Sequence, residues 1–325
     1  MSDALLDELR AIIQRDVNNR GLARDPHDNL FTACRDDFAN ACRSIAENPQ
    51  PSIAIVTGFF IPHAQPPCSE TDGPLGALFL ARAFRWLGFS VTLFIDKELC
   101  LCRALALGLN ECGLLPPVYP YTIPLLFIKK YHRSSNSIRD LFWQAFRRHW
   151  GVTHLIASER VGPGLDGRCR NMHGHDVTDQ NDPAHLLVEE IVRQAPPVCT
   201  IGIGDGGNEI GMGKIPAEVI ARNIPNGERI ACRVPTDHLI VAGISNWGAY
   251  ALAAGVAVLR RQCLPASLFD VERERELLRV MVEQGPLVDG VTARQTVTVD
   301  GLAFDDYAEP LRRIGELLER ERWLT

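Results

Sequence analysis

The stretch richest in candidate functional residues is 200–214, TIGIGDGGNEIGMGK, which holds six glycines directly after a predicted strand. Gly206 and Gly207 let backbone N–H groups approach an anion closely, because glycine has no Cβ atom. Asp205 and Glu209 add two carboxylates to the same turn. Carboxylates beside an anion-binding loop favour a bridging cation, and Mg²⁺ or Mn²⁺ prefers such oxygen ligands. The sequence therefore predicts a small anionic substrate held with a divalent metal, with a glycine-rich turn and helix-capping acids as the alternative.

Other cofactors are disfavoured. The glycine spacing fits neither the dinucleotide-binding fingerprint nor the phosphate-binding loop of nucleotide hydrolases, because Lys214 is not followed by Ser or Thr. We therefore expect no nucleotide cofactor. His173 and His175 lie two residues apart, but without a third spaced ligand they make a weak zinc motif.

A second group of acids follows the first predicted strand, in the sequence SETDGP. Thr71 or Asp72 can simply cap the helix that Pro74 begins, which leaves Glu70 unexplained. Acids at the carboxyl end of a strand are well placed as general base or metal ligand. We therefore expect Glu70 and Asp72 to be catalytic and Thr71 to contact the substrate, with capping alone as the alternative.

A third group, Glu159 and Arg160, also directly follows a predicted strand. Arg160 can hold a substrate carboxylate through two parallel hydrogen bonds, and a structural ion pair with Glu159 is the alternative. Ser245, Asn246 and Trp247 begin a predicted helix, where free N–H groups can bind an anion or a side chain can cap the helix. We expect these three residues to bind substrate.

Two Asp-Gly pairs, at Asp289 and Asp300, are typical of tight turns. A turn explains both pairs, and we assign a further role, as a metal ligand beside Asp205 and Glu209, to Asp289.

Strands and helices alternate along the chain, which predicts right-handed crossovers between parallel strands. The predicted strands are 52–60, 90–96, 154–158, 198–203 and 238–244. The predicted helices are 4–17, 74–88, 97–109, 184–193, 247–260, 271–283 and 305–319. The fold class is therefore α/β, a mostly parallel sheet covered by helices on both faces, with the ligand site at the carboxyl ends of the strands.

The composition excludes several classes of protein. The 325 residues are 46% hydrophobic and 23% charged, as in ordinary globular proteins, and carry a net charge of −6. Without a clustered basic run, nucleic acid is not the expected partner. No apolar run is long enough for a membrane span, and the acidic N-terminus does not fit a signal peptide.

The ten cysteines are scattered without any Cys-x-x-Cys pair. We therefore expect free thiols and a cytoplasmic location. The expected domains are an N-terminal helical segment, 1–49, and a single catalytic α/β domain, 50–325, with a homo-oligomer as an open possibility. The proline-rich stretch 114–137 is an insertion or a lid.

The motifs together resemble the D-glutamate cyclase family, in particular its C-terminal catalytic domain, which also occurs as a stand-alone protein. The resemblance covers about residues 50 to 305 and rests on SETDGPLGA, ERVGP, NMHG, GDGGNEIGMG, TDHLIVAGISNWGAYAL and LVDGVT. It implies a lyase that converts D-glutamate to 5-oxo-D-proline and water.

The residue chemistry suggests a role for each group in such a reaction. A metal held by Asp205 and Glu209 would polarise the side-chain carboxylate of the substrate. Glu70 or Asp72 would take a proton from the ammonium group and return one to the departing oxygen, and Glu209 is a further catalytic candidate. The N–H groups of the 206–208 turn, including Asn208, would hold the α-carboxylate with the helix start at 246–247, or Arg160 would.

Two other functions fit the same residues. Acids, a divalent cation and glycine amides also suit a metal-dependent phosphate-ester hydrolase. A sensor that binds a small anion without turnover is the alternative from outside the enzymes.

Overall fold

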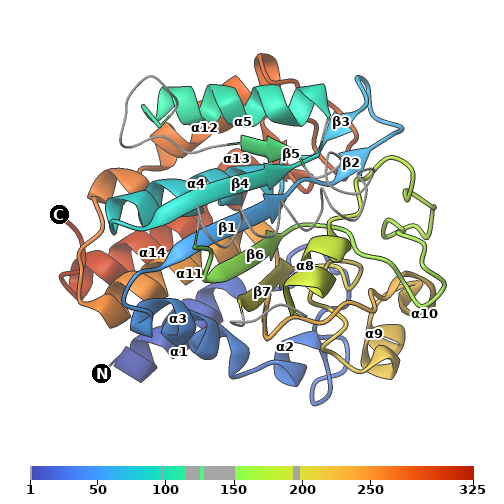
Figure 1. Ribbon diagram of the computed structural model, residues 1–325, viewed down its shortest axis with the longest axis horizontal. Coiled ribbons are helices and arrows are strands. Elements are labelled where there is room, and N and C mark those ends of the chain that lie inside the picture. Colours follow the sequence, from blue (N-terminus) through green and yellow to red (C-terminus); the bar gives the residue numbers. More distant parts are fainter. Residues whose placement is uncertain (1, 97, 115–124, 128–150, 193–197) are drawn as a thin grey trace.

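A six-stranded sheet with the strand order β5-β4-β1-β6-β7-β8 forms the centre of the molecule. Figure 1 shows this sheet from β5 to β7. The computed structural model describes residues 2–96, 98–114, 125–127, 151–192 and 198–325. Every neighbouring pair in the sheet is parallel, so the predicted α/β class is confirmed. The strands are β1 Ser52–Thr57, β4 Ser90–Ile95, β5 Leu125–Phe127, β6 His154–Ser158, β7 Cys199–Gly204 and β8 His238–Val241.

Both faces of the sheet are buried, because successive side chains of a strand point to opposite faces. In β1, Ile53 and Ile55 belong to the larger hydrophobic core, whereas Ala54 and Val56 belong to a smaller one on the other face. This double burial explains why the strands appear in the sequence as continuous apolar runs.

Helices cover each face. The larger core contains α1 Ser2–Ile13, α3 Asp37–Glu47, α4 Pro74–Trp86, α5 Leu99–Glu111, α11 Ser245–Arg260, α12 Val271–Glu283, α13 Phe304–Tyr307 and α14 Glu309–Arg320. The smaller core contains α2 Leu30–Ala33, α8 His185–Val192, α9 Ala217–Asn223 and α10 Gly227–Ile230. None of the described helices is long and apolar enough to cross a lipid bilayer.

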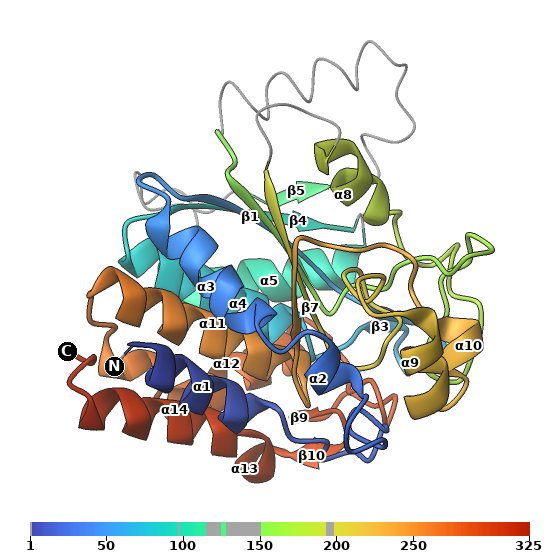
Figure 2. The ribbon, with the colours of Figure 1, turned by 90° about the horizontal axis from the view of Figure 1, so that it is seen from below.

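Helix α11 is the central helix of the larger core. All of its residues from Ser245 to Val258 are buried, and many are alanine or glycine, which allows close helix packing. Helices α3 and α4 make its most extensive contacts, and Figure 2 shows α1 and α14 side by side along it. The N-terminal helices thus share one core with the sheet, and a domain boundary at 49/50 stays a prediction.

Several element ends differ from the expected ones. Strand β1 stops at Thr57 because Gly58 turns the chain at a φ of +105°. A short hairpin follows, β2 Phe60–Ile61 with β3 Cys68–Ser69. The helix predicted over 305–319 is two helices, α13 and α14, because Pro310 starts a new helix. The predicted insertion or lid at 114–137 lies outside the described residues, apart from Leu114 and β5.

The expectation that all cysteines are free is wrong. Cys68 and Cys100 form a disulfide, with their Cα atoms 6.0 Å apart. No local pattern indicates this pair, because 32 residues, which include α4 and β4, separate the two cysteines and only folding places β3 against α5.

Candidate active site

A cavity of about 370 Å³ lies at the carboxyl ends of the central strands. Four acids line it, Glu70, Glu159, Asp205 and Asp300, together with the guanidinium of Arg20. Glu159 and Asp205 directly follow β6 and β7, whose parallel pairing brings both residues to the same sheet edge. Acids from four separate segments of the chain therefore share one cavity.

Asp205 is the centre of this acidic cluster. It belongs to two groups of three carboxylates in which one oxygen of each lies within 4.8 Å of the others: Asp72, Asp205 and Asp300, and Glu159, Asp205 and Glu209. Its Oδ1 pairs with Arg20, but no described residue partners its buried Oδ2. Burial raises the pKa of Asp205, and the charge of Arg20 opposes that rise.

Arg20 reaches the cavity from the loop that follows α1. Its guanidinium pairs with Asp205 and lies 2.9 Å from Oδ2 of Asp300. Asp16 fixes this loop by accepting the N–H groups of Arg20 and Gly21, each at 2.8 Å. Burial acts to lower the pKa of Arg20, but the surrounding carboxylates raise it well above its ordinary value. Arg20 is therefore a permanent positive charge in the cavity.

The glycine-rich loop binds an acid of its own. The N–H groups of Asp205, Gly206 and Gly207 donate to the Glu209 carboxylate at 2.8, 2.6 and 2.7 Å. Asn208 lines the cavity and donates its side-chain amide to a backbone carbonyl oxygen at 2.8 Å. In this conformation the anion bound by the glycine N–H groups is Glu209, which fixes the loop that presents Asp205.

Glu70 faces the cavity and is only 7% exposed. Burial raises its pKa well above the ordinary value, and the charges of Asp300 and Asp72 add to the effect. The side chain lies so close to Gly290 that a Cβ atom there would come within 1.7 Å of Oε2. Gly290 therefore leaves the space that Glu70 occupies, and burial beside other acids favours the protonated form of Glu70.

The side-chain oxygens of Asp72 and Asn246 accept hydrogen bonds from backbone N–H groups. Oδ2 of Asp72 accepts the N–H of Ser245, and Oδ1 accepts that of Asn246, both at 2.9 Å. In return, Oδ1 of Asn246 accepts the N–H groups of Gly73 at 2.9 Å and Gly76 at 2.7 Å. Asp72 thus caps α11, not the helix that follows it in the sequence, and the α11 N–H groups expected to bind substrate are occupied. Burial raises the pKa of Asp72 to about 7, with the charge of Asp300 as the next cause.

Glu159 lines the cavity, although the sequence predicted for it only an ion pair with Arg160. It adopts a φ of +44°, which a residue other than glycine rarely does. Its Oε2 accepts a hydrogen bond of 2.5 Å from the Ser245 hydroxyl. Burial raises its pKa well above the ordinary value, and the nearby charges of Glu209 and Asp72 add to that rise.

Arg160, Thr71 and Trp247 serve the scaffold. Arg160 is fully buried and forms an ion pair with Asp96 at 2.7 Å, while it donates to the Gly58 carbonyl oxygen at 2.6 Å. The Thr71 hydroxyl and the Trp247 indole N–H each donate to a backbone carbonyl oxygen at 2.9 Å. None of the three lines the cavity of Glu70 and Asp205.

Asp289 organises the loop around it. Its Oδ1 accepts the N–H groups of Val291 and Thr292 at 3.0 and 2.7 Å. Its Oδ2 accepts the Thr298 hydroxyl at 2.7 Å and the Gly301 N–H at 2.8 Å. Asp289 belongs to neither group of three carboxylates around Asp205.

Asp300 occupies the turn of a second hairpin, β9 Thr298–Val299 with β10 Leu302–Ala303. Asp300 and Gly301 both have positive φ, +54° and +77°, as a two-residue hairpin turn requires. The same turn brings the Asp300 carboxylate to Arg20 and the cavity. An Asp-Gly turn signal therefore concealed a site residue.

Sequence reasoning thus missed Arg20 and Asp300 and gave Glu159 no role in the site. Arg20 lies in a polar loop between two helices, but nothing in the sequence of that loop indicated that its side chain would point into the cavity. His173 also lines the cavity, and neither His173 nor His175 belongs to a group of potential metal ligands among the described residues.

The cavity residues fit a divalent cation. All candidate ligands are carboxylate oxygens, which hard cations prefer, and Oδ2 of Asp205 is a buried acceptor without a described partner. Ionised, the four lining acids and Arg20 carry a formal charge of −3. Asp205 is the residue common to both groups of three carboxylates, and Asp300 and Glu159 are the other members of these groups that line the cavity.

Two comparisons with known proteins bear on this site. A family described as "D-glutamate cyclase-like, C-terminal" matches residues 9–315. The human protein "D-glutamate cyclase, mitochondrial" is 30% identical over 338 aligned positions, which cover 94% of this chain and 51% of the human protein. The chain therefore spans about half the length of this curated relative, and the match includes the segment that carries Arg20.

Proposed function

The chain belongs to the D-glutamate cyclase-like family, and from this premise we propose that it is a lyase converting D-glutamate to 5-oxo-D-proline and water. The observation that supports the proposal is the position of Glu70, a buried acid with a raised pKa, in one cavity with the Asp205 carboxylate and the Arg20 cation. An acid, a cation and a potential metal ligand are what an intramolecular attack on a carboxylate needs.

The reaction forms one bond and breaks one. The α-nitrogen bonds to the side-chain carboxyl carbon, and one carboxyl oxygen leaves as water. Two protons leave the ammonium group and two arrive at the departing oxygen, so no external oxidant or base is consumed. The main demand on the protein is therefore proton transfer between two substrate atoms, and the second demand is stabilisation of the negative tetrahedral intermediate.

We assign the proton transfer to Glu70. Its raised pKa favours the protonated carboxyl group, so Glu70 can donate to the departing oxygen and then accept a proton from the nitrogen. Asp72 is the weaker candidate for this step, because both of its oxygens accept N–H groups at the start of α11.

We assign the α-carboxylate of the substrate to Arg20, in place of Arg160, which pairs with Asp96 outside the cavity. A substrate with net negative charge is repelled by the acids of the cavity, so further positive charge is needed. We propose that Mg²⁺ or Mn²⁺ binds at Asp205, with Glu159 and Asp300 as further ligands. When bound, the metal would polarise the side-chain carboxylate and stabilise negative charge on it.

The test is turnover of D-glutamate followed by chiral chromatography, with metal removed by a chelator and then restored as Mn²⁺. We expect loss of D-glutamate, an equal gain of 5-oxo-D-proline, and much slower turnover in the chelator. L-glutamate and a phosphomonoester are the control substrates. Hydrolysis of the phosphomonoester without conversion of D-glutamate would favour the hydrolase, and calorimetric binding of D-glutamate without turnover would favour the sensor.

A further inference from the structure

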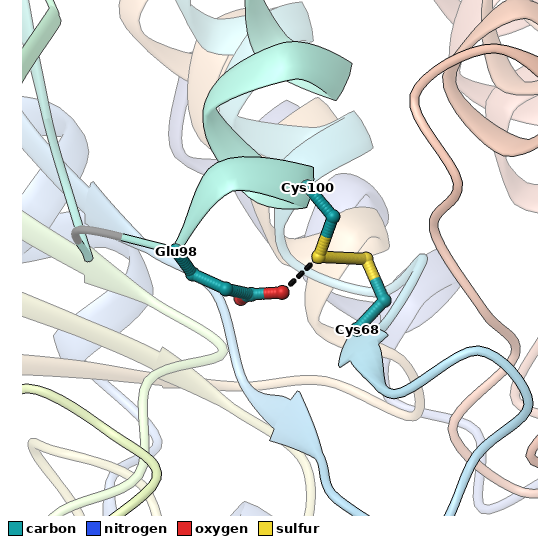
Figure 3. Close-up of side chains that lie close together, drawn as sticks. All are labelled: Cys68, Glu98 and Cys100. Carbon is teal, nitrogen blue, oxygen red and sulfur yellow. Dashed lines mark hydrogen bonds between the residues drawn. A yellow bond between two sulfur atoms is a disulfide. The ribbon is translucent and has the colours of Figure 1, made fainter.

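The disulfide between Cys68 and Cys100 lies directly next to the segment that carries Glu70. It joins β3 to the first turn of α5, and Cys68 precedes Glu70 by two residues. Figure 3 shows the Glu98 carboxylate pointing at the sulfur of Cys100. Cys68 is fully buried, whereas Cys100 is partly exposed, which favours Cys100 as the cysteine that an external thiol attacks.

Glu98 is positioned as a proton carrier for the two sulfurs. A carboxylate oxygen of Glu98 and the sulfur atoms of Cys68 and Cys100 all lie within 4.8 Å of one another. The Ser69 hydroxyl and N–H hold the Glu98 carboxylate at 2.6 and 3.2 Å. Burial raises the pKa of Glu98 to about 7, so the carboxyl group exchanges its proton near neutral pH.

We propose that Cys68 and Cys100 are a reversible thiol–disulfide site, with Glu98 as its proton carrier, that fixes the segment leading to Glu70. Its reaction partner is a small or protein dithiol, and the oxidising partner is the corresponding disulfide. The chemical part of the proposal is independent of the proposed lyase activity. Its effect on turnover rests on that activity.

Reduction takes place in two balanced exchange steps. A thiolate of the dithiol attacks the sulfur of Cys100, the Cys68–Cys100 bond breaks, and its electron pair goes to Cys68, which takes the proton of Glu98. The second thiol of the reductant then attacks the mixed disulfide and loses its proton to Glu98. Cys100 leaves as a thiolate and is protonated from solvent, and the reductant becomes a cyclic disulfide. Oxidation follows the same steps in reverse.

The disulfide holds the segment that carries Glu70 from one side. On the other side, the N–H of Glu70 donates to the Phe59 carbonyl oxygen at 2.9 Å, and β3 pairs with β2. Breaking the disulfide leaves the Ser69–Glu98 hydrogen bonds between β3 and the start of α5, and the backbone pairing of Ser69 and Thr71 with Val288. We therefore expect reduction to loosen the position of Glu70 without unfolding the sheet.

The first test is chemical and needs no substrate. The intact protein is equilibrated in buffers of graded reduced and oxidised dithiothreitol, alkylated, digested and analysed by mass spectrometry. We expect Cys68 and Cys100 to change state together at one midpoint, whereas Cys102 on the same helix stays alkylated throughout. Alkylation of Cys68 and Cys100 under all oxidising conditions would overturn the proposal, as would a failure of dithiothreitol to reduce the folded protein.

The second test isolates Glu98. In Glu98→Gln, reduction by dithiothreitol should be slower on the order of tenfold. After correction for the ionisation of the reductant, the rate should also lose its dependence on pH near neutrality. The charged groups that act on Glu98 are Asp96 and Arg160, which are kept in this variant. Equal corrected rates in Glu98→Gln and the unsubstituted protein would remove Glu98 from the site.

The third test links the disulfide to Glu70. Reduction should lower kcat for D-glutamate on the order of tenfold, because a displaced acid transfers protons poorly. Cys68→Ser and Cys100→Ser should each show that lower kcat in both buffers, whereas Cys102→Ser should respond to reduction like the unsubstituted protein. Equal kcat in the reduced and oxidised forms would overturn the link to Glu70. If D-glutamate is not a substrate at all, only the proposed function fails, and limited proteolysis between β2 and α4 in the two redox states then decides the link.

Discussion

Asp72 and Asn246 cap each other's helices. The Asp72 carboxylate accepts the first N–H groups of α11, and the side-chain oxygen of Asn246 accepts two N–H groups at the start of α4. The two helices therefore begin at one shared point, directly beside the cavity. At Gly76 a Cβ atom would come within 2.6 Å of the Asn246 oxygen, so glycine allows the close approach.

We expect each cap to stabilise the fold. Asn246→Ala and Asp72→Ala each leave buried N–H groups unpaired and should lower the free energy of unfolding by about 1–3 kcal/mol. The double variant should lose less than the sum of the two, because the pair is reciprocal. Urea denaturation of the four proteins measures this cycle. Strict additivity would show that the caps act independently.

Glu70→Gln should remove turnover without unfolding the protein. Replacing the acid by an amide removes the proton transfer, which contributes about 10²–10⁴-fold to such rates. The measurement is kcat with D-glutamate alongside thermal denaturation. A rate within the error of the unsubstituted protein would show that another acid carries the proton.

Gly290→Ala is the matched steric variant. Its added methyl group displaces the end of the Glu70 side chain and leaves the charge of the cavity unchanged. We expect a reduced kcat and an unchanged affinity for Mn²⁺. Loss of Mn²⁺ affinity in this variant would show that Glu70 is a metal ligand.

Asp205→Asn should weaken Mn²⁺ binding by at least about tenfold, because Asp205 is common to both carboxylate groups. Asp289→Asn is the control among the metal ligands proposed from the sequence. Its carboxylate is fully engaged within its own loop, so we expect lower stability and an unchanged affinity for Mn²⁺. Titration calorimetry separates the two variants, and equal losses of affinity would return Asp289 to the ligand set.

Substitution of Arg20 should change KM, whereas substitution of Arg160 should change stability. Arg20→Gln should raise KM by about tenfold or more, because the proposed partner of the substrate carboxylate is lost. Arg160→Lys should lower the free energy of unfolding by about 1–3 kcal/mol and leave KM unchanged, because the fork of Arg160 pairs with buried Asp96. A raised KM in Arg160→Lys with normal stability would reverse the two assignments.

Glu98 should make stability depend on pH. Its pKa is about 7 in the folded protein and ordinary in the unfolded chain, so the folded state binds the proton more tightly. Its stabilising effect is complete below the ordinary pKa and is lost as pH rises toward about 7. Between about pH 5 and pH 8, oxidised Glu98→Gln should therefore gain about 1–2 kcal/mol relative to the unsubstituted protein. Urea denaturation without reductant measures this, and a constant difference would contradict the raised pKa.

Local sequence patterns were sufficient for five of the six strands of the sheet, but not for β5, which lies in the stretch predicted as an insertion or a lid. The apolar runs of β1, β4, β6 and β7 and the helix α12 over Val271–Glu283 follow from continuous burial and from helical spacing. The same patterns indicated that acids after parallel strands meet at one sheet edge, and Asp205 and Glu70 do line one cavity. The short helices α2, α9 and α10 escaped because four to seven residues carry too little periodicity.

The sequence by itself determined the fold class and the residue types of the site, because periodicity and the chemistry of a motif are local properties. The tertiary structure decided what each polar group faces. It directs Arg160 to Asp96, Asp72 to the start of α11 and Asp289 into its own loop, and it brings Arg20 and Asp300 to Asp205. A carboxylate or guanidinium takes whichever partner the packed elements bring within hydrogen-bond distance, and residues far apart in the chain acquire that distance only on folding.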